Sequence, residues 1–297
     1  MEKKHVIVVG AGFAGLTAAR ELQTAGIEYH IVEARDRIGG RAWTDDRLGR
    51  PLEIGATWVH WHQPHVWSEI TRYGQDIIAS PVVDTAYWYA GGELKSGTEA
   101  EMDAKLARPM EKIFEKSREF FPEPHKPLLV LDEKFGASQE LKDAFLAADQ
   151  AGVLDALEDG DFTQEEKDLC NAYWSAGYIG YPEQGSSLMA KQWAALCDHR
   201  LSLVDEQTLR YKLVNGMRGI YGNIAKDLTG EIRLNTAVTA IEHGEDSATV
   251  TYADGTSETA DAVIVTVPVG ALGNIEFNPG LPEGSQKTIE QLSLIHI

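Results

Sequence analysis

The stretch His5-Val-Ile-Val-Val-Gly-Ala-Gly-Phe-Ala-Gly15 decides the fold of this chain. Four consecutive apolar residues at 6–9 predict a buried parallel strand, because a strand covered on both faces reads as an unbroken apolar run. The helical spacing of apolar residues at 16–22 predicts a helix directly after the glycines. A second strand is expected at 29–32, and Glu33 follows it.

The three glycines of the turn have separate tasks in a dinucleotide site. Gly10 allows the tight turn, Gly12 lets the backbone approach a pyrophosphate, and Gly15 permits close packing of the helix. The amino terminus of that helix then faces the anion. Glu33, about 20 residues further on, is placed to accept a hydrogen bond from a ribose hydroxyl. Strand, glycines, helix and terminal acid together predict a dinucleotide-binding site.

A second glycine pair favours FAD over NAD. In the segment at 35–41, Gly39 and Gly40 offer backbone that a flat ring or a phosphate can approach, and Arg41 can form paired hydrogen bonds with that phosphate. A plain NAD domain needs neither the pair nor the arginine. An ordinary glycine loop without a ligand is the alternative for this segment taken alone.

Three segments resemble the amino-terminal half of the flavin-containing amine oxidase family, which includes monoamine and polyamine oxidases. They are VIVVGAGFAGLTAAREL from Val6, IVEARDRIGGRAWT from Ile31 and LEIGATWV from Leu52. The resemblance implies an α/β fold, in which a Rossmann-like FAD-binding domain carries an inserted, mainly helical substrate domain. It places residues 55–58 beside the flavin ring and Val238 on the adenine side. The implied FAD contacts are Gly10, Gly12, Ala14, Gly15, Glu33, Ala34, Arg35, Gly39, Gly40, Arg41, Gly55, Ala56, Thr57, Trp58 and Val238.

The pattern of predicted elements changes from about residue 80. Apolar spacing predicts helices at 98–121, 138–148, 163–174 and 187–197, the third opened by a capping box from Thr163 to Glu166. Strands are then expected at 232–234, 237–242, 248–252 and 259–267, with Asp254-Gly255 as a hairpin turn. The run at 261–268 is apolar enough to predict a buried strand. We therefore predict an FAD-binding domain at 1–79 and 209–277, a substrate domain at 80–208, and the start of a truncated substrate-domain segment at 278–297.

Composition and charge narrow the class of protein. The chain has 297 residues, 43% of them hydrophobic and 25% charged, which is ordinary for a globular protein with two cores. No apolar run reaches 18 residues and no secretory segment follows residues 1–5, so we expect a cytoplasmic protein without membrane contact. The net charge of −19 argues against nucleic acid as a partner. Cys170 and Cys197 are too few for a disulfide framework and are expected as reduced, partly buried thiols.

Three histidines gather at 60–65, where a metal site has to be considered. Pro64 interrupts any helix that could align His60, His62 and His65, and no acidic or cysteine residue stands beside them. We expect no metal here. Aromatic packing near the flavin remains open beside the alternative that these aromatic residues have no special role.

The resemblance also locates the end of this chain within the family fold. Beyond residue 282 the family has a helix, a glycine where Ile295 stands here, and a lysine near the flavin N5, about two positions past Ile297. The chain is therefore expected to be truncated, without the second FAD-binding segment, the aromatic cage or any cysteine linked to the flavin. No residue present is assigned as catalytic.

The function implied by the resemblance is FAD-dependent oxidation of a small-molecule amine by O₂. The carbon bearing the unprotonated amine gives up a hydride, the imine is hydrolysed, and H₂O₂ forms. A protoporphyrinogen-oxidase-like or desaturase-like flavoenzyme shares the region from Glu33 to Arg41, although residues 55–58 favour the amine oxidases. A third hypothesis is an inactive fragment that binds FAD weakly or not at all.

Overall fold

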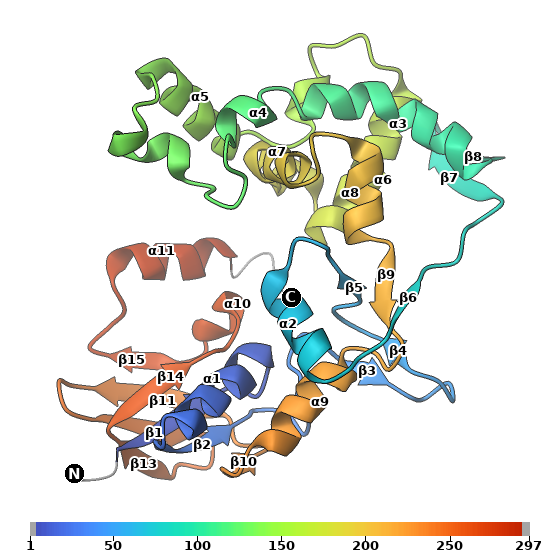
Figure 1. Ribbon diagram of the computed structural model, residues 1–297. Coiled ribbons are helices and arrows are strands. Elements are labelled where there is room, and N and C mark those ends of the chain that lie inside the picture. Colours follow the sequence, from blue (N-terminus) through green and yellow to red (C-terminus); the bar gives the residue numbers. More distant parts are fainter. Residues whose placement is uncertain (1–3, 293–297) are drawn as a thin grey trace. The chain divides into compact units, whose positions relative to one another are not determined.

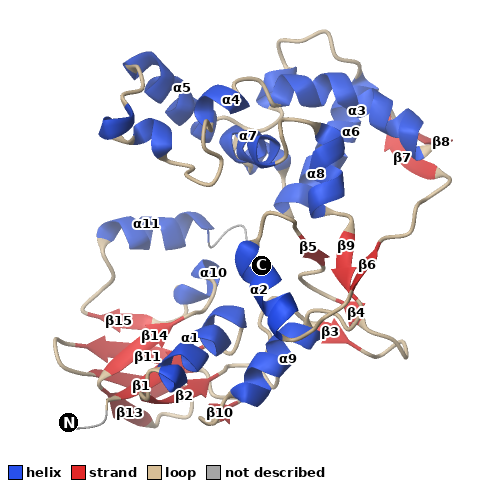
Figure 2. Cartoon of the chain, viewed as in Figure 1, coloured by secondary structure: helices blue, strands red, loops and turns tan. Residues whose placement is uncertain are grey.

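The computed structural model describes residues 4–292 (Figures 1 and 2). Backbone contacts divide the chain into two compact units. The first comprises Met1–Trp58, Pro64–Ile78 and Lys212–Ile297, and the second comprises Val59–Gln63 and Ala79–Tyr211. Ile295, where the family has a glycine, lies outside the described residues. The assignment of the predicted segments to cofactor and substrate stays a prediction.

The first unit is built on a parallel sheet with the strand order β10-β2-β1-β14. Each neighbouring pair in it runs parallel, so the carboxyl ends of the strands meet at one edge. Strand β1 is central and buried, as its apolar run predicted. The strands of this sheet are β1 (His5–Val9), β2 (Glu28–Val32), β10 (Ile232–Arg233) and β14 (Ala262–Val265).

A second, mainly antiparallel sheet packs on one face of the first. Its strand order is β13-β12-β11-β15, and the Asp254-Gly255 hairpin joins β12 to β13 as predicted. Ile7 and Val9 of β1 share a buried cluster with Val250 of β12. The strands of this sheet are β11 (Val238–His243), β12 (Ala248–Tyr252), β13 (Ser257–Ala260) and β15 (Glu276–Asn278).

Helices cover the parallel sheet and complete the first unit. Helix α1 (Phe13–Thr24) packs against β2 and against α9 (Arg218–Asp227) (Figure 1). The other elements of this unit are β3 (Thr44–Asp45), β4 (Leu52–Glu53), α2 (Pro64–Arg72), α10 (Val269–Leu272) and α11 (Glu283–Leu292). The chain passes between the units at β5 (Trp58–Val59), β6 (Ile77–Ala79) and β9 (Tyr211–Leu213).

The single strand predicted at 259–267 is two strands in the structure. The chain leaves the antiparallel sheet after β13, turns at Asp261, and enters the parallel sheet as β14. Asp261 fixes this change, because its Oδ2 accepts a hydrogen bond of 2.7 Å from the backbone N–H of His5. The prediction of a buried strand was wrong for the described residues: β14 is the outer strand of its sheet, with Ala262 exposed and the next three residues half-buried.

The second unit is mainly helical, apart from one hairpin (Figure 2). The hairpin consists of β7 (Ala86–Ala90) and β8 (Glu93–Gly97). The α-helices are α3 (Glu99–Ile113), α4 (Ser117–Phe120), α5 (Gln139–Gln150), α6 (Gln164–Tyr178), α7 (Ser187–Leu196) and α8 (Leu201–Thr208). Short 3₁₀ helices occur at Leu129–Leu131, Glu133–Phe135, Asp155–Leu157 and Pro182–Gln184.

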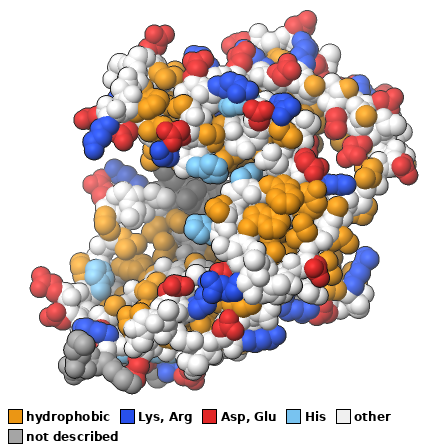
Figure 3. All heavy atoms as spheres, viewed as in Figure 1, with side chains coloured by type: hydrophobic (Ala, Val, Ile, Leu, Met, Phe, Trp, Pro, Cys, Tyr) orange, Lys and Arg blue, Asp and Glu red, His pale blue; other side chains and the backbone are white. Residues whose placement is uncertain are grey.

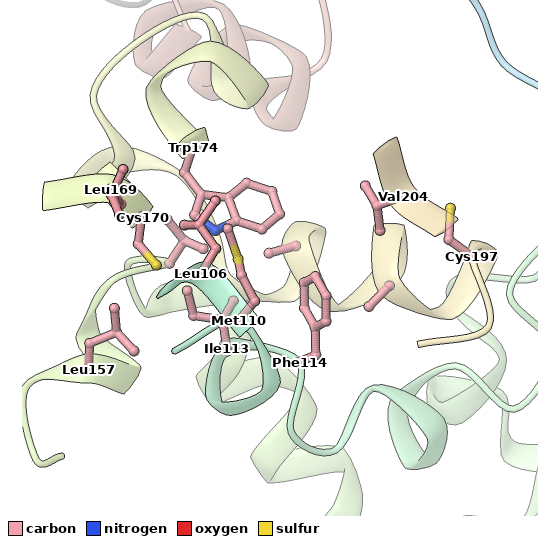
Figure 4. Packing of buried hydrophobic residues seen from close by; sticks show 13 residues of the cluster. Leu106, Met110, Ile113, Phe114, Leu157, Leu169, Cys170, Trp174, Cys197 and Val204 are labelled. Carbon is pink, nitrogen blue, oxygen red and sulfur yellow. The ribbon is translucent and has the colours of Figure 1, made fainter. Parts of the chain in front are cut away.

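The main core of the second unit forms around Trp174 (Figure 4). Met110 of α3 and Ala194 of α7 are fully buried in the same cluster. Cys170 and Cys197 are both free and buried, and they belong to this core as small apolar side chains. Neither forms a disulfide in the structure, as predicted, but both are fully buried, whereas the sequence predicted partial burial.

The capping box at Thr163 is confirmed, because its side chain accepts from Glu166 N–H and the Glu166 carboxylate accepts in return. A second box, between Thr98 and Glu101, opens α3. The one long helix predicted at 98–121 was wrong: Lys116 adopts a left-handed conformation with φ of 62° and separates α3 from α4. The apolar spacing continues across that break, so the sequence pattern did not reveal it.

The surface carries acidic and basic side chains intermixed on the face that Figure 3 shows. Of the helices in the described range, none has the length and apolar composition needed to cross a bilayer.

A partly buried ion pair joins α1 to α2 within the first unit. Arg20 donates two hydrogen bonds to Glu69, of 2.7 Å to Oε2 and 2.6 Å to Oε1. The side chains are 9% and 16% exposed, so little solvent screens the pair. The hydrogen bonds from Arg20 hold the pKa of the Glu69 carboxyl below its ordinary value.

We expect Glu69→Gln to lower the free energy of unfolding of the first unit by about 3 kcal/mol, because it leaves the Arg20 charge buried without its partner. The folded-state pKa of Glu69 lies below its unfolded value, so this stabilisation is present above pH 4.5 and is lost as pH falls through the folded pKa. Denaturant unfolding at pH 7 and at pH 3, followed by tryptophan fluorescence, measures both effects.

The matched control is Glu21→Gln, which alters the other carboxylate near Arg20. Glu21 lies 3.7 Å from Arg20 and is 68% exposed, so its removal should change stability by less than about 0.5 kcal/mol. Equal losses in the two variants would contradict the account given for Glu69.

Candidate functional site

The predicted glycine turn follows β1 at the carboxyl edge of the parallel sheet. Gly10 has a φ of +106°, a conformation that side chains oppose, and its N–H donates to the carbonyl of Val32 at 2.8 Å. A Cβ on Gly15 would stand 1.9 Å from the carbonyl oxygen of Gly10, so α1 packs against the turn only because this side chain is missing. The tasks assigned to these two glycines by the sequence agree with this geometry.

The amino terminus of α1 presents unsatisfied N–H groups. Gly12 is its N-cap residue and supplies no side-chain hydrogen bond, and the first turn holds no acidic residue. Ala14 lies exposed in that turn. A twelve-residue helix whose first N–H groups lack partners can bind an anion such as a pyrophosphate.

Glu33 is held at the end of β2 by two backbone amides. Its Oε2 accepts from Ala11 N–H at 2.8 Å and its Oε1 accepts from Arg35 N–H at 2.9 Å. The residue is 8% exposed, and the bonds from both sides fix the carboxylate beside the glycine turn. Each oxygen keeps acceptor capacity, which leaves room for hydroxyl donors such as those of a ribose.

The second glycine pair packs directly on the first turn. Gly39 N–H donates to the carbonyl of Ala11 at 2.8 Å, and Gly39 pairs with Gly12 in a short parallel bridge. Gly39 and Gly40 both have positive φ, of 96° and 61°. A Cβ on Gly40 would lie 3.2 Å from the Cα of Gly12, so the two turns meet backbone to backbone.

Two exposed arginines flank these turns. Arg35 follows Glu33, and Arg41 follows the glycine pair. In the described part of the chain, neither guanidinium forms an ion pair with a carboxylate. Both are therefore available to an anionic ligand.

The backbone of Arg41 also holds the predicted flavin-ring segment. Ala56 N–H donates to the Arg41 carbonyl at 3.2 Å, and a Cβ on Gly55 would lie 1.9 Å from that oxygen. Thr57 donates its hydroxyl to the Gly55 carbonyl at 3.0 Å. Trp58 is half-buried, and the Lys212 ammonium lies 5.2 Å from the centre of its ring.

The residues just before Val238 are hydrogen-bonded to the segment that contains Glu33 and Arg35. Asn235 N–H donates to the Arg35 carbonyl at 2.9 Å, and Thr236 N–H donates to the Glu33 carbonyl at 2.8 Å. These bonds hold the residues just before β11 beside Glu33 and Arg35, and the adenine-side contact of Val238 stays a prediction. All the cofactor residues predicted from the sequence therefore lie in the first unit, around the carboxyl ends of β1 and β2.

Three supporting residues were missed by the sequence reasoning. Thr266 donates its hydroxyl to the Val9 carbonyl at 2.8 Å and fills the space under Gly10 and Gly15. The ring of Tyr221 packs on Gly39, 3.0 Å from where a Cβ would stand. Asn235 takes a left-handed φ of 55° to turn the chain toward Arg35. Only Thr266 carried a signal, as a polar residue inside an apolar run.

A cavity of about 790 Å³ lies in the first unit beside these turns, but it contains none of the predicted cofactor residues. Its lining includes Arg37, Trp43, Arg218, Tyr221 and Lys226. Arg218 is already paired with Asp46, so the positive charge of this cavity is partly neutralised.

The three histidines considered for a metal are divided between the two units. His60 and His62 belong to the second unit, with ring centres 5.6 Å apart, whereas His65 belongs to α2 of the first. Burial lowers the pKa of His60 to about 4, so its ring is neutral at neutral pH. His60 also packs edge-on against Trp193 at 5.9 Å.

The chain matches a known protein family over most of its length. The family model for flavin-containing amine oxidoreductases matches residues 13–296. Nicotine dehydrogenase of Pseudomonas putida is 31% identical over 291 residues, which are 96% of this chain and 58% of that protein. Polyamine oxidase 2 of Arabidopsis thaliana is 30% identical over 294 residues, 97% of this chain and 56% of that protein.

A solved structure of a putrescine oxidase triple mutant superposes with a TM-score of 0.75 at 26% identity, covering 97% of this chain and 63% of that one. The chain therefore spans less than two thirds of the length of these relatives. The shared fold confirms the predicted α/β class, and the family match confirms both the resemblance and FAD as the cofactor. The chain belongs to the flavin-containing amine oxidoreductase family of enzymes.

Proposed function

We propose that the protein oxidises a small-molecule amine with FAD and passes the electrons to O₂. The amine becomes an imine, water hydrolyses the imine to an aldehyde and ammonia or a smaller amine, and O₂ becomes H₂O₂. One observation supports this proposal above the others. The turn at Gly10–Gly15 pairs with the turn at Gly39–Gly40 and binds the Glu33 carboxylate, in a chain of the amine oxidoreductase family.

The residues around the double turn fit FAD in order along the cofactor. The open N–H groups of α1 after Gly12 would bind the pyrophosphate, with the Arg41 guanidinium beside it. Glu33 would accept from the ribose hydroxyls with its remaining lone pairs. Val238 would contact the adenine side. Most of these contacts come from backbone whose position is set by glycines and strand ends.

Residues 55–58 would lie along the flavin ring. Their backbone is tied to Arg41, so the segment that holds the phosphate also positions the segment beside the ring. FAD, when bound, supplies the two-electron acceptor for a carbon that bears an amine. The protein itself would orient that ring and keep water away from it. Exclusion of water favours the unprotonated amine, because a charged amine is less stable without water around it.

The relatives support an amine as the substrate, but they do not identify which amine it is. Their names include polyamine oxidases, a nicotine dehydrogenase and a putrescine oxidase, and all the compounds in these names contain a basic nitrogen. Some are named oxidases and others dehydrogenases. The use of O₂ as acceptor is thus a separate element of the proposal and needs its own measurement.

The whole protein, purified with FAD, should reduce its flavin when mixed anaerobically with one member of an amine panel containing primary amines, polyamines and amino acids. Bleaching of the visible flavin absorption reports the first half-reaction, and admission of air should restore the colour and release H₂O₂. If the flavin is bleached but is not quickly reoxidised in air, the electron acceptor is not O₂, and that element of the proposal is wrong. No bleaching with any amine would overturn the proposal.

Gly15→Ala should abolish or strongly reduce the FAD content of the purified protein, because the new Cβ meets the Gly10 carbonyl at 1.9 Å and pushes α1 away from the turn. Flavin absorbance per chain measures the occupancy. Gly284→Ala is the matched control, since this glycine also lies near the start of a helix but has no atom within 4 Å of the added Cβ. Equal FAD content in both variants would contradict the role given to Gly15.

A further inference from the structure

Three potential ligand side chains from separate strands meet in the first unit, away from the glycine turns. His5 comes from β1, His30 from β2 and Glu258 from β13. One ligand atom of each can be chosen so that all three lie within 4.8 Å of one another. The Nε2 of His5 is 3.1 Å from Nδ1 of His30, and Nε2 of His30 is 3.4 Å from Oε2 of Glu258.

The central ring of this cluster has an unused nitrogen. His30 is 4% exposed, and its Nε2 is buried without a hydrogen-bond partner among the described residues. A buried polar atom without a partner costs free energy, so it calls for a function. The orphaned atom faces the Glu258 carboxylate, at a distance longer than a good hydrogen bond.

Two imidazoles and one carboxylate are a ligand set used for zinc and related divalent ions. With metal–ligand bonds of about 2.0–2.1 Å, tetrahedral ligand atoms stand about 3.3 Å apart. The distances of 3.1 and 3.4 Å involve different nitrogens of His30, and one ion can use only one of them. With one atom chosen from each residue, the three ligand atoms lie within 4.8 Å of one another, at most about 1.5 Å beyond the tetrahedral separation.

The surroundings of Glu258 resemble the outer layer of a metal site. Arg233 donates to its Oε2 at 2.8 Å, and the Tyr252 hydroxyl donates to the same atom at 3.1 Å. Carboxylates that bind metals are commonly held by hydrogen bonds of this kind. The positive charge of Arg233 is shared with Glu231, whose carboxylate lies 2.7 Å from its Nε, so it opposes a cation less.

We propose that His5, His30 and Glu258 bind one divalent ion of the zinc type, with a fourth position left to water. The ion would replace the hydrogen bond between the two histidines and join β1 and β2 of the parallel sheet to β13 of the second sheet. His5 is the first residue of β1 and the glycine turn follows its last, about 13 Å away along the strand. The site is therefore separate from the proposed FAD contacts and serves stability.

Titration of the purified protein with Co²⁺ tests the site, because cobalt bound by nitrogen and oxygen ligands absorbs visible light. Since FAD absorbs there too, each spectrum is taken as a difference from the metal-free protein. We expect one Co²⁺ per chain, displacement by Zn²⁺, and a higher unfolding temperature with either ion. His5→Gln and Glu258→Gln should each weaken binding at least tenfold and remove the thermal shift.

His243→Gln is the matched control, since this exposed histidine of β11 lies in the same unit and outside the cluster. It should bind Co²⁺ as the unaltered protein does. FAD content, measured on every variant, separates loss of the metal site from loss of the fold. Absence of saturable Co²⁺ binding, or equal affinity in His5→Gln and the unaltered protein, would overturn the proposal without touching the proposed amine oxidation.

Discussion

The first unit depends on a contact between two backbones. The turn after β1 and the glycine pair at 39–40 meet so closely that a Cβ on Gly40 would lie 3.2 Å from the Cα of Gly12. The Gly39 amide then reaches the Ala11 carbonyl, and Ala11 in turn donates to Glu33. Gly39 and Gly40 are the positions that require glycine, because both have positive φ and a Cβ on Gly39 would stand 2.5 Å from the Ala42 carbonyl oxygen.

This use of backbone explains how distant relatives keep one fold. The putrescine oxidase structure is only 26% identical to this chain over the aligned region and still superposes with a TM-score of 0.75. Where contacts are made by N–H and carbonyl groups, the requirement on sequence falls on glycine spacing and strand ends. Glu33 is the exception, because its carboxylate itself is held between two amides.

Local patterns in the sequence were sufficient for much of this architecture. The glycine spacing, the capping box at Thr163 and the Asp254-Gly255 hairpin each depend on neighbours within a few residues. The errors arose where an element ends although its apolar pattern continues. Lys116 breaks a helix whose apolar spacing continues, and Asp261 divides a strand because it binds the amide of His5.

The same limit applies to the sites. The cofactor residues carry a recognisable order along the chain, whereas His5, His30 and Glu258 have no common motif. They become neighbours only through the pairing of β1 with β2 and the packing of the second sheet. Thr266 and Tyr221 are similar cases, since each fills space beside a glycine far away in sequence.

The position of β14 has a consequence for how the protein is made. β1 pairs with β14 along its length, and the bond between His5 and Asp261 spans 256 residues. The parallel sheet is therefore incomplete until residue 265 has left the ribosome, whereas almost all of the second unit lies in the continuous stretch Ala79–Tyr211. During synthesis the helical unit can fold first. Until β14 has been made, the apolar strand β1 before the glycine turn lacks one of its neighbours. Chaperones that bind nascent chains would find their main target in the first unit.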